Sequence, residues 1–311
     1  MKVLFDLTQL NNISFLFVAD FKQLLICLGC QTASASFPCP YYLVALKDLT
    51  PSDDVDLSDV SNDNVEERTF GNIEESHDKF VKELASNRKK AKLCNSTVES
   101  SLLHEDPELR VIDKCPPEEL HMMQGFVNHT FWKGFCKVIG REKALEFPKL
   151  LGCAKQDYHG EVFEGNACRE MLRNAERMQD RIVLGDMSPL KVLPYVRTYK
   201  AMDKLVGCCF GSRIVDRDEA LDLLNEVMMS YLDTGLSVTL KLHVIFYHLL
   251  PALQNPILNG RGLGKVSGQA GESIHSEFKE IWKKYKINSI ENKRYGENLL
   301  KAVIEFSSKH I

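Results

Sequence analysis

The stretch SGQAGESIHSEFKEIW, residues 267–282, joins a run of small residues to an amphipathic helix, and the rest of the chain is organised around it. Its glycines let the backbone turn tightly and approach a neighbouring segment closely. The apolar residues that follow recur at helical spacing, which predicts one buried face: Ile274, Phe278, Ile281 and Trp282. Glu272 lies in the first turn, where a carboxylate favours the helix dipole. The same position would suit a catalytic carboxylate that binds metal, and spacing alone favours the simpler role.

Helical periodicity runs through almost every segment between residues 68 and 250. The double proline at 116 and 117 is typical of a helix start, because proline is tolerated in the first turn. Pro251 and Pro256 close this block, and a glycine-rich stretch then leads to residue 267. The pattern predicts a mostly α fold.

The beginning of the chain has a different pattern. Residues 1–10 read as a short helix, and residues 13–19 read as a buried strand that ends at Asp20. A helix with Phe21, Leu24, Leu25 and Leu28 on one face follows. This order would place the Asp20 carboxylate at the C-terminal edge of a sheet, where α/β domains carry their sites.

Composition excludes several classes of protein. The chain has 311 residues, 44% of them hydrophobic, and a net charge of -4. Its ten cysteines lack the dense spacing of a secreted disulfide scaffold, and the sequence shows no convincing signal peptide. No window of about 18 residues is uninterruptedly apolar, so we expect no membrane partner. A reducing compartment, the nucleus or the cytoplasm, is the interpretation that fits.

Two carboxylates on adjacent elements of one core, Asp20 and Glu272, could share divalent metal ions, which prefer oxygen ligands. Two such ions can activate a hydroxyl and stabilise the leaving oxygen of a phosphodiester. That chemistry normally needs at least three carboxylates, and the sequence offers no evident position for the third.

A second set of candidate ligands consists of Cys39, His243 and His248. The two histidines are five residues apart, which on an ideal helix separates them by about 140°, so a shared metal would require a local break or bend. Isolated histidines of this kind are more often core or surface residues. Cys27 and Cys30 form a C-x-x-C, which without a second pair is weak evidence for zinc.

Four separated motifs carry a resemblance to a known family, and they lie at residues 116–121, 125–129, 158–169 and 268–275. With them the chain resembles the catalytic region of eukaryotic DD(E/D) cut-and-paste DNA transposases, in particular uncharacterised transposon-derived proteins of invertebrates. More distantly it is similar to Transib transposases and to the catalytic subunit of the V(D)J recombinase.

The resemblance assigns a role to each candidate residue. Asp20 takes the position of the second catalytic Asp, and Glu272 that of the catalytic Glu. Cys39 takes the first position of a zinc-binding C-x-x-C, and His243 with His248 supplies H-x-x-x-x-H. The second cysteine is replaced by Tyr42, a poor zinc ligand, so we expect little or no tightly bound zinc.

The implied fold is the remnant of an RNase H-like α/β core interrupted by a large helical insertion. Residues 1–50 would be part of that core, and residues 51–67 an acidic linker. Residues 68–258 would be the insertion, and residues 259–311 the glycine-rich loop and C-terminal helices that return to the core.

The implied activity is metal-dependent DNA cleavage and strand transfer in the nucleus, with Mg²⁺ or Mn²⁺ on Asp20 and Glu272 and with DNA as the partner. A homo-oligomer is compatible with the resemblance. The first catalytic Asp is expected upstream of Asp20, so the sequence resembles an N-terminally truncated transposase and we expect it to be inactive. The alternative is a non-catalytic module that binds DNA or protein, built from the helical block.

Overall fold

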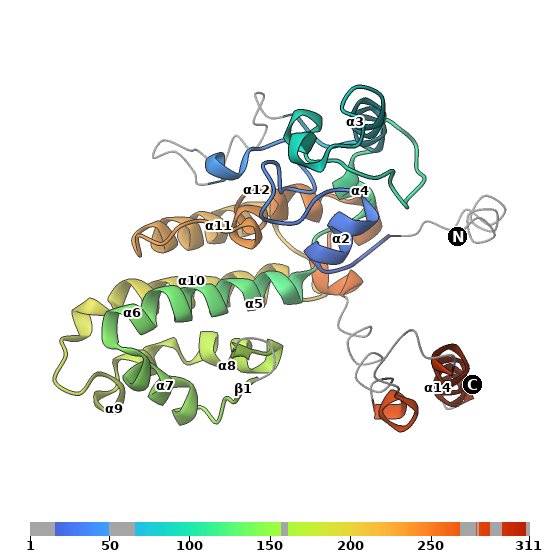
Figure 1. Ribbon diagram of the computed structural model, residues 1–311. Coiled ribbons are helices and arrows are strands. Elements are labelled where there is room, and N and C mark those ends of the chain that lie inside the picture. Colours follow the sequence, from blue (N-terminus) through green and yellow to red (C-terminus); the bar gives the residue numbers. More distant parts are fainter. Residues whose placement is uncertain are drawn as a thin grey trace. The chain divides into compact units, whose positions relative to one another are not determined.

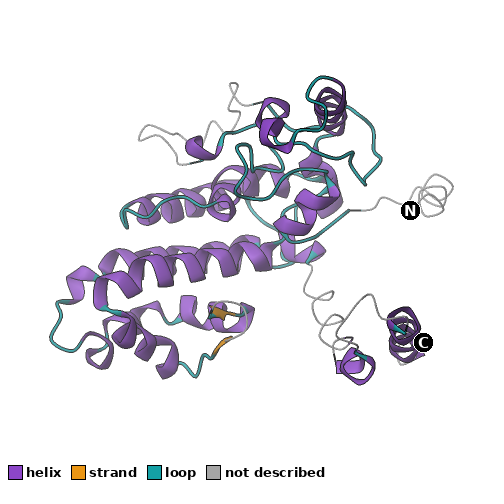
Figure 2. Ribbon diagram, viewed as in Figure 1, coloured by secondary structure: helices purple, strands orange, loops and turns teal. Residues whose placement is uncertain are grey.

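The computed structural model describes residues 16–49, 66–156, 161–267, 278, 280–286 and 294–308. The chain divides into two compact units, residues 1–266 and 267–311. Both are helical where they are described, and Figure 2 shows how little strand accompanies the helices. The predicted mostly α fold is confirmed, while an RNase H-like remnant is not shown.

The first unit contains the following α-helices and shorter helical turns in chain order: α2 (Phe21–Cys27), η1 (Leu46–Asp48), α3 (Phe70–Lys82), η3 (Arg88–Cys94), α4 (Val111–Lys114), α5 (Glu119–His129), η4 (Thr130–Phe135), α6 (Cys136–Ile139), α7 (Arg141–Leu150), α8 (Gly165–Arg173), η6 (Ala175–Gln179), α9 (Arg181–Leu184), η7 (Pro189–Lys191), α10 (Leu193–Cys209), α11 (Arg217–Leu232), α12 (Leu240–Leu253), η8 (Pro256–Leu258) and η9 (Leu263–Val266). The turn η4 is a π-helix and the other η elements are 3₁₀ turns.

Long helices form the centre of this unit, with α10 packed on α11 and α5 packed on both α8 and α12 (Figure 1). One continuous apolar core joins them, and it includes residues of α2 as well as residues of α5 and α12. The predicted apolar face of α2 is confirmed, because Phe21, Leu24, Leu25 and Leu28 are all buried. Within the described residues, no helix is both long and apolar enough to cross a membrane.

The predicted strand at residues 13–19 is wrong over the part that the structure describes, because residues 16–20 form no regular structure. Their backbone contact runs from the Phe17 N–H to the Lys114 carbonyl rather than to a strand partner. The described residues contain one sheet, the antiparallel pair β1 (Lys155–Gln156) and β2 (Val162–Phe163). A strand needs a neighbouring strand to pair its backbone groups, and residues 16–20 have no such neighbour among the described residues. They are only partly buried, with Phe17 packed against the helical core. The predicted helix at residues 1–10 lies outside the described residues.

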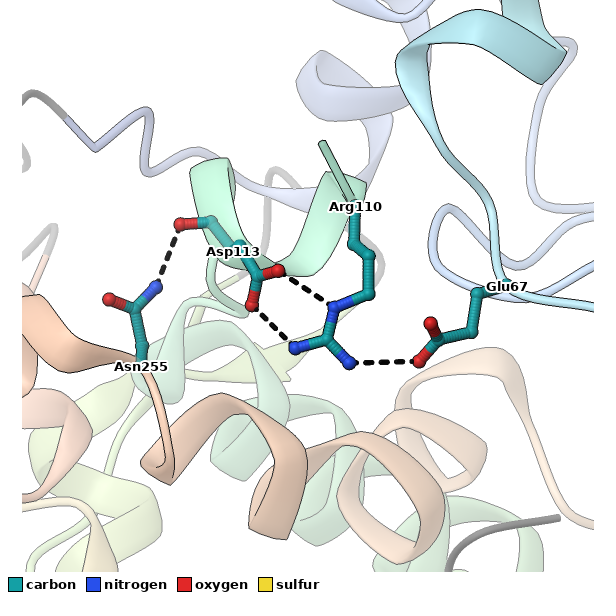
Figure 3. A network of polar contacts seen from close by, with 4 residues as sticks. All are labelled: Glu67, Arg110, Asp113 and Asn255. Carbon is teal, nitrogen blue, oxygen red and sulfur yellow. Dashed lines mark hydrogen bonds and ion pairs between the residues drawn. The ribbon is translucent and has the colours of Figure 1, made fainter. Parts of the chain in front are cut away.

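A polar network fastens α4 to the segment before α3 and to the end of α12 (Figure 3). Arg110 donates from Nε and Nη2 to the two carboxylate oxygens of Asp113, at 2.7 and 2.8 Å, and from Nη1 to Glu67 at 3.0 Å. Asn255 donates from Nδ2 to the Asp113 backbone carbonyl at 2.7 Å. The bidentate pair fixes the side chains in one geometry.

The second unit contains α14 (Tyr295–Ser308) and a helical segment at residues 278 and 280–285. The rings of Trp282 and Tyr295 meet edge to face, and the Tyr285 hydroxyl donates to Glu305 at 2.8 Å. Of the predicted buried face, Ile281 is buried, whereas Phe278 and Trp282 are only partly buried and Ile274 lies outside the described residues. Glu272, the candidate catalytic carboxylate, lies outside the described residues.

Candidate metal centre

The candidate centre is built on α12, an apolar helix that is buried along almost its whole length. The Thr239 side chain caps its N-terminus by accepting from the Leu242 N–H. Its two histidines point their rings toward each other, and the Nε2 atoms of His243 and His248 lie 3.3 Å apart. The helix is continuous between them, so the two rings meet without a break in α12. The imidazoles are long enough to meet at their tips although their Cα atoms face different directions.

The third group comes from a loop distant in sequence. Cys39 is fully buried, and its Sγ lies 3.2 Å from His248 Nε2. The backbone N–H groups of Tyr41 and Tyr42 both donate to this sulfur at 3.4 Å. Such contacts hold a thiolate in one orientation and partly compensate its negative charge.

The three ligand atoms lie within 4.8 Å of one another, a spacing that one metal ion can bridge. Imidazole nitrogens bind zinc at about 2.0–2.1 Å, so two of them on a tetrahedral ion lie about 3.4 Å apart. The 3.3 Å separation of the two Nε2 atoms matches that value. A buried group of Cys39, His243 and His248 could therefore bind a metal ion such as zinc.

Burial sets the charge state of the three groups before metal arrives. Burial lowers the pKa of His243 to about 4, against a smaller opposing effect of the Leu49 backbone, and it lowers the pKa of His248 well below its ordinary range. Burial raises the pKa of the Cys39 thiol to about 11, against the opposing effects of the two amides and of Arg68. At neutral pH all three groups are uncharged, and a metal ion would displace the thiol proton.

No fourth ligand joins this group among the described residues. The ring of Tyr42 meets the His248 ring edge-on at a centroid distance of 4.3 Å. Tyr41 contacts the same imidazole from a centroid distance of 5.0 Å. The described part of the site therefore has three ligands and an aromatic wall.

A buried cation lies beside the centre. Arg68 is 1% exposed and donates from Nε to the Cys39 carbonyl at 3.2 Å. Its other donors reach the Cys30 sulfur at 3.8 Å and the Asn95 carbonyl at 3.3 Å. Within the described part of the chain, no carboxylate forms an ion pair with this guanidinium. No motif in the sequence pointed to this arginine, which follows the acidic run.

Asp20 occupies a different setting from the one predicted. It is the N-cap of α2, and its Oδ1 accepts from the Gln23 N–H at 2.8 Å. A cap carboxylate of this kind stabilises the helix start. Because Glu272 lies outside the described residues, the expected pairing of these two carboxylates stays a prediction.

Near Asp20 the fold assembles a cluster that the sequence did not indicate. Glu118 is 3% exposed, and its Oε2 accepts from both the backbone N–H and Nδ1 of His121, at 2.7 and 2.6 Å. The hydrogen bond to Glu118 raises the pKa of His121. Burial lowers the pKa of Lys241, while Asp20 and Glu118 oppose that shift. These residues come from three separate helix starts, so only the tertiary structure brings them together.

In comparisons with known proteins, no protein-family model and no curated protein matches the chain.

Proposed function

We propose that this chain is a helical, metal-binding module derived from a DNA transposase, and that its metal fastens the loop at Cys39 to α12. The observation that carries the metal function is the convergence of Cys39, His243 and His248 in a buried position. The order of Asp20, Cys39, His243, His248 and Glu272 supports the proposed origin through the family resemblance.

A metal ion bound by Cys39, His243 and His248 would act as a long-range cross-link. Cys39 and His248 are 209 residues apart in sequence, and closing so long a loop through a metal restricts the unfolded chain strongly. Metal binding to a site that exists only in the folded state adds directly to folding stability. Zinc is the ion that the resemblance implies.

The metal-binding function is tested by adding metal to the purified full chain, removing it again, and measuring the bound metal and the stability of the protein in each state. One equivalent of metal that stabilises the protein and is lost in His248→Ala supports the proposal. His104→Ala is the matched control, because His104 is exposed and distant from α12 in sequence. Equal metal binding by the wild type and His248→Ala would refute the proposed centre.

The ancestral reaction would be metal-dependent DNA cleavage and strand transfer, with Mg²⁺ or Mn²⁺ held by Asp20 and Glu272. We propose that the chain as given does not catalyse it, since only two of the three required carboxylates are identified in this sequence. The test is incubation with Mg²⁺ or Mn²⁺ and duplex DNA. Cleavage that Glu272→Ala and Asp20→Asn both abolish would overturn this proposal; asparagine keeps the helix cap intact.

A second candidate is a non-catalytic DNA-binding module that acts in the nucleus. Its support is the exposed basic turn η3, which carries Arg88, Lys89, Lys90 and Lys92. Binding through phosphates would weaken steeply with salt and would survive Glu272→Ala. Absence of binding to duplex DNA at low salt would exclude this candidate.

A further inference from the structure

The helix α14 of the second unit presents an apolar face to solvent. Four large aliphatic side chains share this face, and they are exposed by 37%, 59%, 42% and 59% respectively: Leu299, Leu300, Val303 and Ile304. Positions four apart lie above one another on a helix, so these two adjacent pairs form one continuous strip, the apolar strip. Single exposed apolar residues are normal on a protein surface, whereas a contiguous strip is typical of an interaction surface.

A different side of α14 makes the contacts within its own unit. Ala302 is fully buried, and the ring of Phe306 meets the ring of Phe278 edge to face at a centroid distance of 5.8 Å. Glu305 accepts a hydrogen bond from the Tyr285 hydroxyl at 2.8 Å. The helix is therefore held in its unit by one side, while the apolar strip is on another.

Two opposite charges follow one edge of the apolar strip. Glu297 and Lys301 are both exposed and lie one turn apart on α14. At about 100° per residue they fall beside Ile304, on the same edge. When two identical helices pack antiparallel about a two-fold axis, each edge meets the same edge of the other copy. Glu297 of one copy then lies near Lys301 of the other, and the pair occurs twice; a parallel pair would lose this reciprocity.

We propose that α14 is a self-association surface, on which two copies of this chain pair antiparallel through the apolar strip. The strip would supply the buried centre of the contact, and the two Glu297–Lys301 pairs at its rim would set the orientation. A second copy fits this face because the face carries both members of its own charge pair. One helix is a small contact, so we expect a weak dimer with a Kd on the order of 10–100 µM. The inference is independent of the metal centre.

The contact is tested by sedimentation equilibrium of the full chain under reducing conditions, which exclude dimers linked by disulfides. We expect a monomer–dimer equilibrium in which Ile304→Glu raises the Kd at least about tenfold, because it places a charge in the apolar centre. Ile182→Glu on α9 is the matched control, since Ile182 is also a helical isoleucine and is 60% exposed. Leu300→Glu is a second variant in the strip with the same exposed fraction as Ile304. Circular dichroism establishes that each variant folds.

The orientation is tested by exchanging the rim charges. Glu297→Lys and Lys301→Glu each bring like charges together in an antiparallel pair, so each alone should raise the Kd about threefold. An equimolar mixture of the two variants restores both opposite pairs, so it should associate about as tightly as the wild type. The differences should shrink in about 1 M salt, because exposed charges are screened.

Three results would overturn the proposal or a part of it. A chain that stays monomeric at its highest soluble concentration would overturn self-association, and this includes a chain that covers the strip with its own first unit. Dimers that persist in both Ile304→Glu and Leu300→Glu would place the contact elsewhere. A mixture of the two charge variants that associates no better than either variant alone would overturn the antiparallel arrangement.

Discussion

The burial of His243 predicts a loss of stability in mild acid that can be assigned to this one residue. Its pKa is about 4 in the folded protein, whereas an unperturbed histidine titrates near 6.5. Between these values the unfolded chain binds a proton that the folded protein does not, so unfolding becomes easier as the pH falls. The stability is fully present above about pH 6.5 and is lost as the pH falls toward 4.

The magnitude follows from the difference between the two pKa values. The two pKa values of His243 differ by about 2.5, and one pKa unit corresponds to about 1.36 kcal/mol of free energy. The expected loss of stability is therefore about 3 kcal/mol. His248 contributes in the same direction, because burial also lowers its pKa. A loss of this size is a large share of the stability of a typical domain, which is about 5–15 kcal/mol.

The assay is urea unfolding of metal-free protein at closely spaced pH values between 7.5 and 4. We expect His243→Leu, which carries no proton at any pH, to remove about 3 kcal/mol of the pH dependence. His104→Ala is the control, since His104 is exposed. If His243→Leu and the wild type lose stability in parallel from pH 6.5 to 4, the argument from burial is refuted.

Four further outcomes follow from the same structure and are measured by chemical denaturation. Metal at about a hundredfold excess over its Kd should raise the free energy of unfolding by about 2.7 kcal/mol, and His248→Ala should remove that gain. Arg110→Ala breaks the bidentate pair of Figure 3 and should cost about 1–2 kcal/mol, whereas Arg88→Ala removes an exposed pair and should cost less than about 0.5 kcal/mol. Gly29→Ala should cost at least about 2 kcal/mol, because φ is +69° and the added carbon would lie 2.1 Å from a backbone oxygen. Gly207→Ala meets no atom within 4 Å in a helix and should stabilise by about 0.5–1 kcal/mol.

A specific result would contradict each of these predictions. A metal-induced gain that persists in His248→Ala would place the metal elsewhere. Equal costs for Arg110→Ala and Arg88→Ala would mean that the network of Figure 3 adds no more stability than an exposed ion pair. Comparable effects of the two glycine substitutions would show that backbone conformation does not limit residue 29.

The sequence by itself determined the helical class and the faces that are buried. Periodic apolar residues specify a helix locally, since side chains three and four positions apart share one side. For that reason the buried face of α2 could be predicted from Phe21, Leu24, Leu25 and Leu28 alone. The same reasoning failed at residues 16–19, because an apolar run is compatible with any buried conformation until its backbone partner is known.

Part of the metal centre could be predicted from the sequence, and part of it is seen only in the tertiary structure. The family resemblance identified Cys39, His243 and His248 as candidate ligands. The spacing of the two histidines, however, implied that a shared metal would require a local break or bend in the helix. Only the tertiary structure decided that a continuous α12 allows their Nε2 atoms to approach to 3.3 Å, and that Cys39 reaches them from the other end of the chain.

The structure alone supplied the surroundings that set the chemistry. No sequence pattern predicted that Arg68 would lie beside Cys39, that tyrosine rings would contact His248, or that Glu118, His121 and Lys241 would gather near Asp20. Charge, desolvation and coordination number depend on distances between residues far apart in the chain. Periodicity fixes which side of a helix is buried, whereas packing decides which charges meet there.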